Sequence, residues 1–112
     1  MLHEKLECYR RAVRLAEGFS KEGAKWPRGL GYLLDQLRRA MASVVLNLAE
    51  GNARKGPSER RRFFEISRAS VAEVAACVDL MLAFGLIQQE QFVSFKSQLT
   101  EVSCMIWSLM RQ

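Results

Sequence analysis

The last part of the sequence carries a strict repeat of apolar residues that constrains the fold more than any other feature. Apolar positions alternate in steps of three and four residues, at Phe92, Phe95, Leu99, Val102, Ile106 and Leu109. A helix places such a repeat on one side, as the a and d seam of a left-handed bundle. The repeat therefore predicts a helix that needs partner helices to cover its apolar side.

Three more segments show apolar residues at helical spacing, over about residues 2–19, 30–50 and 58–84. The stripe of the first segment is Leu2, Leu6, Tyr9, Val13 and Ala16. The stripe of the second is Leu30, Leu34, Leu37, Met41, Val44, Val45 and Leu48. The inner face of the third is Phe63, Ser70, Val74, Cys77, Val78 and Met81. Four amphipathic helices are therefore expected.

Signals that begin or end helices lie between these segments. Gly51 and Gly85 are expected to end the second and third helices, since glycine adopts the left-handed cap conformation easily. Ser58 is expected to be the N-cap of the third helix. Seven glycines and two prolines are few for an all-β chain of 112 residues. The sequence therefore predicts an all-α, antiparallel up-down four-helix bundle, formed by residues 1–112 as one domain.

Residue types that support catalysis or metal binding are sparse. The only histidine is His3, and no glycine-rich nucleotide-binding motif is present. The three cysteines are odd in number and lie in apolar surroundings, so they are expected to be small buried hydrophobes, at Cys8, Cys77 and Cys104. We therefore expect no catalytic residues, no metal site, no cofactor and no enzymatic activity.

The sequence also carries no pattern typical of export or membrane insertion. Its N-terminus lacks a hydrophobic signal core. The longest apolar stretch, residues 71–87, is interrupted by Glu73 and Asp79, which makes it a poor membrane span. A soluble cytoplasmic protein without a membrane partner is the expectation.

Positive charge is concentrated in one short window. The chain has a net charge of +5, and residues 54–68 alone hold six cationic and two acidic side chains. Arginine, which suits bidentate phosphate contacts, supplies most of the cations. The first candidates for nucleic-acid contact are Arg54, Lys55, Arg61, Arg62 and Arg68. Further candidates, if the helices bring them to the same surface, are Arg38, Arg39, Arg10, Arg11 and Arg14.

This basic window has two interpretations. It is a polyanion-binding surface, in which case binding is dominated by phosphate contacts and depends strongly on salt. Alternatively, it is a solvated helix face balanced by pairs such as Arg61 with Glu65. No aromatic residue alternates with the cations as in a single-strand stacking platform. Asn47 and Glu50 are expected to tie the 51–57 segment to an arginine, such as Arg54 or Arg68, rather than to contact a ligand.

Small and apolar residues also lie away from the predicted core. Ala72, Ala75 and Ala76 lie opposite the core stripe of the third helix, and Tyr32 and Leu46 lie on the far side of the second. These residues predict a second packed face, at which another copy of the chain approaches closely. The alternative is that the alanines only favour helix formation, and that the exposed apolar residues are scattered.

The centre of the sequence resembles a known family. The motifs that carry the resemblance are Gln36-Leu37-Arg38-Arg39-Ala40, Ser43-Val44, Asn47-Leu48-Ala49-Glu50-Gly51, Arg54-Lys55, Phe63-Phe64, Ala69-Ser70 and Glu73. They resemble the bacterial four-helix bundle proteins encoded in intervening sequences of 23S ribosomal RNA genes. These proteins are related to the accessory variability determinant proteins of diversity-generating retroelements. The resemblance implies a homopentamer with a central channel and a basic surface. For the retroelement relatives it also implies binding to nucleic acid and to a reverse transcriptase.

Two hypotheses for function follow. The first is a non-enzymatic, oligomeric four-helix bundle that binds the backbone of RNA or DNA through its arginine-rich surface. Such a protein would be an accessory to a reverse transcriptase or be linked to a 23S rRNA intervening sequence. The alternative is a protein–protein interaction scaffold that does not bind nucleic acid directly.

Overall fold

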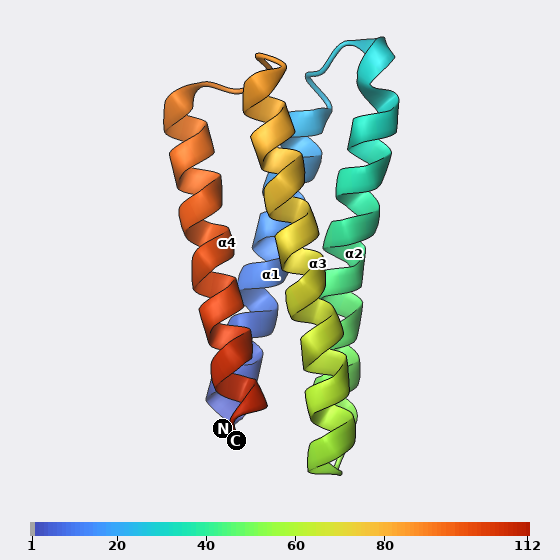
Figure 1. The fold of residues 1–112 in the computed structure, drawn as a ribbon, viewed down its shortest axis with the longest axis vertical. Helices are drawn as coiled ribbons and strands as arrows, with labels where there is room; N and C mark the ends of the chain where they lie inside the picture. The colour runs from blue at the N-terminus through green and yellow to red at the C-terminus, as the bar shows by residue number, and fades with distance from the viewer. Residues whose placement is uncertain (1) are drawn as a thin grey trace.

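Four long α-helices form the protein (Figure 1), in a computed structural model that describes residues 2–112. The helices are α1 (Leu2–Gly23), α2 (Gly31–Ala53), α3 (Pro57–Ala83) and α4 (Gln89–Met110), with a short 3-10 turn, η1 (Arg28–Leu30), before α2. Consecutive helices run in opposite directions, and residues 2–112 include no strand. The predicted all-α, up-down four-helix bundle is therefore confirmed.

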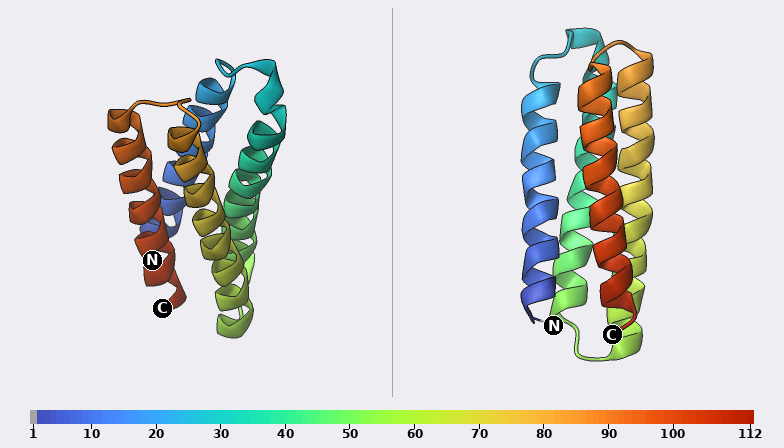
Figure 2. Two further views of the ribbon diagram at one scale, coloured as in Figure 1. Left: turned by 45° about the horizontal axis from the view of Figure 1, so that its top comes forward. Right: turned by 90° about the vertical axis from the view of Figure 1, so that its left-hand side faces the viewer.

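The helices form a closed ring in the order of the chain. Each helix packs against its neighbours in sequence, and α1 also packs against α4 (Figure 2). The seam between α1 and α2 therefore lies across the bundle from the seam between α3 and α4. The two chain ends and the α2–α3 turn lie at one end of the bundle, which measures 44 × 24 × 18 Å. We call this the basic end, because residues 54–68 begin there.

The predicted stripe of α4 lies in the core. Leu99, Val102, Ile106 and Leu109 are buried, whereas Phe92 and Phe95 are half-buried at the other end of the helix. The inner face of α3 was predicted correctly from Ser70 onward, but its first residue was not. Phe64 is fully buried, and Phe63 is only half-buried.

The core stripe predicted for α1 was wrong. The buried residues are Cys8, Ala12, Leu15 and Phe19. In the predicted stripe, Leu2 is 70% exposed and Val13 is 42% exposed. Both sets keep helical spacing, and they lie about 100° apart, because Leu15 and Ala16 are consecutive residues of a helix. Spacing alone does not distinguish two such stripes.

Helix α1 also continues to Gly23, past its predicted end at Phe19. Near this end, the carboxylate of Glu22 accepts a hydrogen bond from Gln91 of α4 at 3.0 Å.

The prediction that Gly51 ends α2 was wrong. The helix continues through it to Ala53, and Gly51 is buried against the ring of Phe64 on α3. Other small residues let these two helices approach closely. The buried hydroxyl of Ser67 donates to the carbonyl oxygen of Val44 at 2.8 Å, and the hydroxyls of Ser43 and Ser70 lie 2.7 Å apart. Close packing of α2 on α3, rather than helix termination, therefore explains the glycine.

The start of α3 also differs from the prediction, which placed its N-cap at Ser58. The N-cap of α3 is Gly56, one residue before Pro57, and Ser58 already lies within the helix. Proline suits this first position because the amide proton it lacks would have no partner inside the helix. Gly85 has a φ of 73°, which agrees with its predicted place after the end of α3. In α4, Gln88 and Gln91 form a reciprocal capping box.

Candidate nucleic-acid interface

The α2–α3 turn holds Arg54 in a fixed position. Its Nη2 lies 2.7 Å from Oε2 of Glu50, one helical turn earlier, and its Nη1 lies 3.9 Å from Oε2 of Glu59. Its guanidinium also lies over the ring of Phe63, with the carbon 5.0 Å from the ring centroid. The expected link between Glu50 and Arg54 is therefore present. Asn47 does not take part in it, because its amide donates to the carbonyl oxygen of Ser43 at 2.9 Å.

Two exposed cations near the turn have no carboxylate partner among the described residues. Among residues 2–112, no carboxylate oxygen lies within 4.0 Å of the ammonium of Lys55 or the guanidinium of Arg62. The backbone of Lys55 is fixed, since its carbonyl oxygen accepts a hydrogen bond from Arg60 at 2.7 Å. The guanidinium of Arg62 lies over Phe63, at 5.7 Å from the ring centroid. Both side chains are exposed and able to contact an anion.

Arg61 and Arg68 already have partners within the bundle. Arg61 Nε lies 3.3 Å from Oε1 of Glu65, which is the pair expected if the helix face is balanced by its own charges. Arg68 Nε donates to the hydroxyl of Ser103 on α4 at 3.0 Å. The Arg68 guanidinium lies 5.0 Å from the ring centroid of Trp107. The Arg61–Glu65 pair expected for a balanced helix face is therefore present, whereas Lys55 and Arg62 have no carboxylate partner among the described residues.

Aromatic rings lie beside three of these cations, although aromatic residues do not alternate with the cations in the sequence. Phe63 contacts both Arg54 and Arg62, and Trp107 contacts Arg68. The adjacency of Arg62 and Phe63 in the sequence signals the first cluster. Nothing in the sequence signals the second, because Arg68 and Trp107 are brought together only by the packing of α3 on α4.

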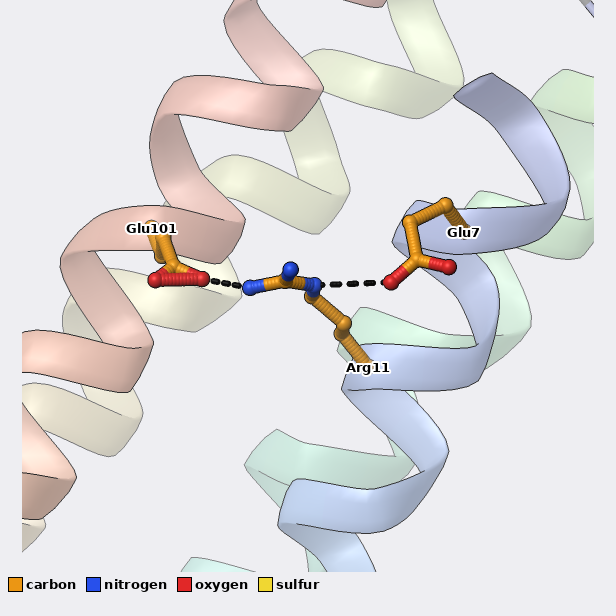
Figure 3. Close-up of polar contacts among 3 residues, drawn as sticks. All are labelled: Glu7, Arg11 and Glu101. Atoms are coloured by element: carbon orange, nitrogen blue, oxygen red, sulfur yellow. Dashed lines mark hydrogen bonds and ion pairs between the residues drawn. The ribbon is translucent and has the colours of Figure 1, made fainter. Parts of the chain in front are cut away.

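Arg11 forms ion pairs with two carboxylates of the bundle. Its Nε lies 2.9 Å from Oε2 of Glu7, one turn earlier in α1, and its Nη1 pairs with Oε1 of Glu101 on α4 (Figure 3). The hydrogen bond from Arg11 lowers the pKa of the Glu7 carboxyl, because it favours the charged form. Arg11 therefore links α1 to α4 across their seam and is a weak candidate for nucleic-acid contact.

The remaining predicted arginines are exposed but do not extend the cluster at the α2–α3 turn. Arg38 and Arg39 lie in α2, fifteen or more residues before Arg54, which is about 22 Å along the helix axis. Arg10 and Arg14 lie on α1 and have no carboxylate within 4.0 Å in the described part of the chain. Arg38 and Arg39 therefore form a separate positive site on α2, whereas Arg10 and Arg14 add positive charge to the surface of α1.

The predicted self-association residues fall on two faces instead of one. Leu46 and Tyr32 are each 64% exposed. Leu46 lines an apolar groove of about 320 Å³ along the α1/α2 seam, together with Val13. Ala72 and Ala75 line a groove of about 460 Å³ along the α3/α4 seam. Ala76 is exposed, and Ala75 is half-buried against the core. The two grooves are on opposite sides of the bundle.

The three cysteines differ in burial, and the part of the chain that the structure covers contains no cluster suited to a metal ion. No group of three or more His, Cys, Asp or Glu residues within 2–112 is placed to hold a metal ion. Burial raises the pKa of the Cys8 thiol to about 12 and also raises that of Cys77. Cys104 is exposed, which corrects the expectation that all three cysteines are buried. None of the helices over residues 2–112 is long and apolar enough to cross a membrane.

The fold and this site define a small all-α bundle with an arginine-rich end. The chain belongs to the 23S rRNA-intervening sequence protein family, whose model matches residues 4–108. Its fold is similar to the crystal structure of a protein of unknown function from the S23 ribosomal protein family of Bacteroides thetaiotaomicron. That match has a TM-score of 0.72 at 19% sequence identity and covers 98% of this chain and 94% of that one. A search of curated proteins found no match.

Proposed function

We propose that this protein is a non-enzymatic nucleic-acid-binding bundle that contacts phosphates with its basic end. The observation that carries the proposal is the pair of exposed, unneutralised cations beside the α2–α3 turn, Lys55 and Arg62. A phosphate oxygen that approaches them displaces only water and counterions. Arg54 and Arg61 already contact a carboxylate each, so a phosphate would have to replace that carboxylate before it could bind to them.

This arrangement favours binding that depends on charge and not on base sequence. Arginine and lysine contacts to phosphates release counterions, so affinity falls as salt rises, with a slope of about 0.7 to 0.9 per phosphate contact. The helices present no recognition element in the manner of a helix-turn-helix. RNA and DNA are therefore both candidate ligands.

A charge-reversal pair tests the proposal. Fluorescence anisotropy with labelled RNA and DNA, at several salt concentrations, measures affinity and salt slope for the wild type and for Lys55→Glu/Arg62→Glu. We expect the variant to bind more weakly. We also expect the slope of its log affinity against log salt concentration to be smaller in magnitude by about one to two units. The control is Lys21→Glu/Arg28→Glu, which changes net charge equally at the opposite end of the bundle. No wild-type binding at low salt, or equal losses in both variants, would contradict the proposal.

We also propose that copies of the chain associate. The apolar α1/α2 groove with Leu46 and the small-residue α3/α4 groove with Ala72 are different surfaces on opposite sides. Contact between unlike faces generates rings when the rotation closes. The family resemblance implies a pentamer. A ring would repeat the basic end around its axis, so that weak contacts add by avidity.

The alternative function is a scaffold for another protein, such as a reverse transcriptase, with no direct nucleic-acid binding. The same exposed apolar groove along α1 and α2 favours it, because contiguous apolar surface marks interaction sites. Recovery of a protein partner that survives nuclease treatment, from a chain that binds no nucleic acid alone, would support this alternative.

A further inference from the structure

Two aromatic rings at the basic end are left partly outside the core, and each is covered by arginine. Phe63 is half-buried although the next residue, Phe64, is fully buried. Trp107, near the end of α4, is 42% exposed.

The arginines on these rings keep donors free. The guanidinium carbon of Arg62 lies 5.7 Å from the centroid of the Phe63 ring, and Arg62 has no carboxylate partner within residues 2–112. Arg68 uses Nε for the hydroxyl of Ser103, which leaves its two terminal nitrogens without a partner in the described chain. A ring covered by a guanidinium with free donors offers both a stacking surface and a phosphate contact.

Both clusters lie in the half of α3 nearest the basic end, but on different sides of that helix, since positions five residues apart are about 140° apart around the helix axis. Phe63 and Arg68 are five residues apart in α3, which is about 7.5 Å along the helix axis. Trp107 reaches Arg68 from the last turns of α4, near the C-terminal end of the chain (Figure 1).

We propose that the basic end binds unpaired nucleobases of a single strand, with Phe63 and Trp107 as stacking rings and Arg62 and Arg68 as the phosphate contacts. This inference rests on the proposed nucleic-acid binding and specifies its ligand. Unpaired bases stack on aromatic rings and on guanidinium planes, whereas the bases of a duplex already stack on one another. Only a base of a single strand is therefore free to stack on the ring and the guanidinium that covers it.

The test separates base stacking from phosphate attraction. The probes are labelled 12-mers of single-stranded RNA, single-stranded DNA, duplex DNA and an abasic DNA strand with the same number of phosphates. The variants are Phe63→Leu and Trp107→Leu, which keep apolar volume and remove the ring. The control is Phe84→Leu, an aromatic residue that is 47% exposed at the opposite end of the bundle. Circular dichroism confirms that each variant is folded.

We expect each ring variant to lose about five-fold or more in affinity for both base-bearing single strands, because stacking contributes about 1–3 kcal/mol per base. Binding to the abasic strand and the duplex, and the salt slope, should stay within two-fold of wild type. Phe84→Leu should change nothing. Equal losses on the abasic strand, or no loss on any strand, would overturn the stacking proposal while phosphate binding stands. Failure of the wild type to bind any probe would overturn the proposed function itself.

A second measurement reports stacking directly. In a Trp26→Phe background, Trp107 is the only tryptophan. A base-bearing strand should quench its fluorescence, and the abasic strand at equal saturation should not. Equal quenching by both strands would show that Trp107 responds to binding without contacting a base, which also overturns its role.

Discussion

The ring of Phe64 on α3 lies directly against the backbone of Gly51 on α2, where a Cβ atom at position 51 would overlap two of the ring carbons. Phe64 is fully buried, so the ring has no space into which to move. The absence of a side chain at Gly51 is therefore what allows α2 and α3 to approach at the basic end. The position of the α2–α3 turn, and of Arg54 and Lys55 within it, depends on this contact.

The Gly51→Ala variant should be less stable than the wild type. Alanine favours a helix by about 1 kcal/mol over glycine, but overpacking a core costs about 1–3 kcal/mol, and the fixed ring makes the second effect the larger. We expect a net loss of about 1–2 kcal/mol in the free energy of unfolding by urea. The control is Gly18→Ala in α1, whose added methyl meets only Phe95 at 4.0 Å and should stabilise by about 0.5–1 kcal/mol. A stabilised Gly51→Ala would contradict the steric role.

Removal of Arg11 should weaken the α1–α4 seam in a pH-dependent way. Arg11 lowers the pKa of Glu7, so the contribution of the pair to stability is present above the usual carboxyl range and is lost as pH falls through the lowered pKa of Glu7. We expect Arg11→Gln to have a lower Tm than wild type at pH 7, and the difference in Tm to shrink progressively as pH falls below the usual carboxyl range. Arg10→Gln, an exposed neighbour without a carboxylate partner in the described chain, is the control. A Tm difference that persists unchanged in acid would argue against the ion pair.

The three thiols should differ in reactivity. Burial keeps Cys8 protonated at pH 8, since its pKa is about 12, and it raises the pKa of Cys77 in the same direction. Cys104 is exposed on α4. We expect one fast-reacting thiol per native chain in a disulfide-exchange assay and three after denaturation. Cys104→Ser should remove the fast phase, and its survival in that variant would show that a buried thiol becomes accessible in the native state.

A charge placed in the α1/α2 groove should prevent self-association. Leu46 is 64% exposed and lines this groove, so Leu46→Glu would bury a carboxylate in any interface formed there. Sedimentation should give an oligomer for the wild type and a 12.8 kDa monomer for the variant. The control is Val93→Glu, which is 56% exposed on α4 outside this seam and should leave the oligomer intact. A monomeric wild type at micromolar concentration would rule out the association.

The sequence by itself determined the class of fold, because apolar spacing and the scarcity of turn residues admit only helices. It also located the connections between the helices to within a few residues, the stripe of α4 and the Glu50–Arg54 pair, all of which depend on residues close together in the chain. For α1, however, two stripes with the same spacing were available, and only contact with the other helices decides that Leu15 is buried and Val13 exposed.

The tertiary structure decided what lies beside each arginine. Trp107 meets Arg68 and Glu101 meets Arg11 only because α4 packs against α3 and α1, and no local pattern encodes those neighbours. The same holds for Gly51, whose partner Phe64 lies across the turn on another helix. Periodicity fixes the direction of a side chain around its own helix axis. Which partner it meets depends on how the helices pack, and that packing separates the free cations Lys55 and Arg62 from the paired Arg11.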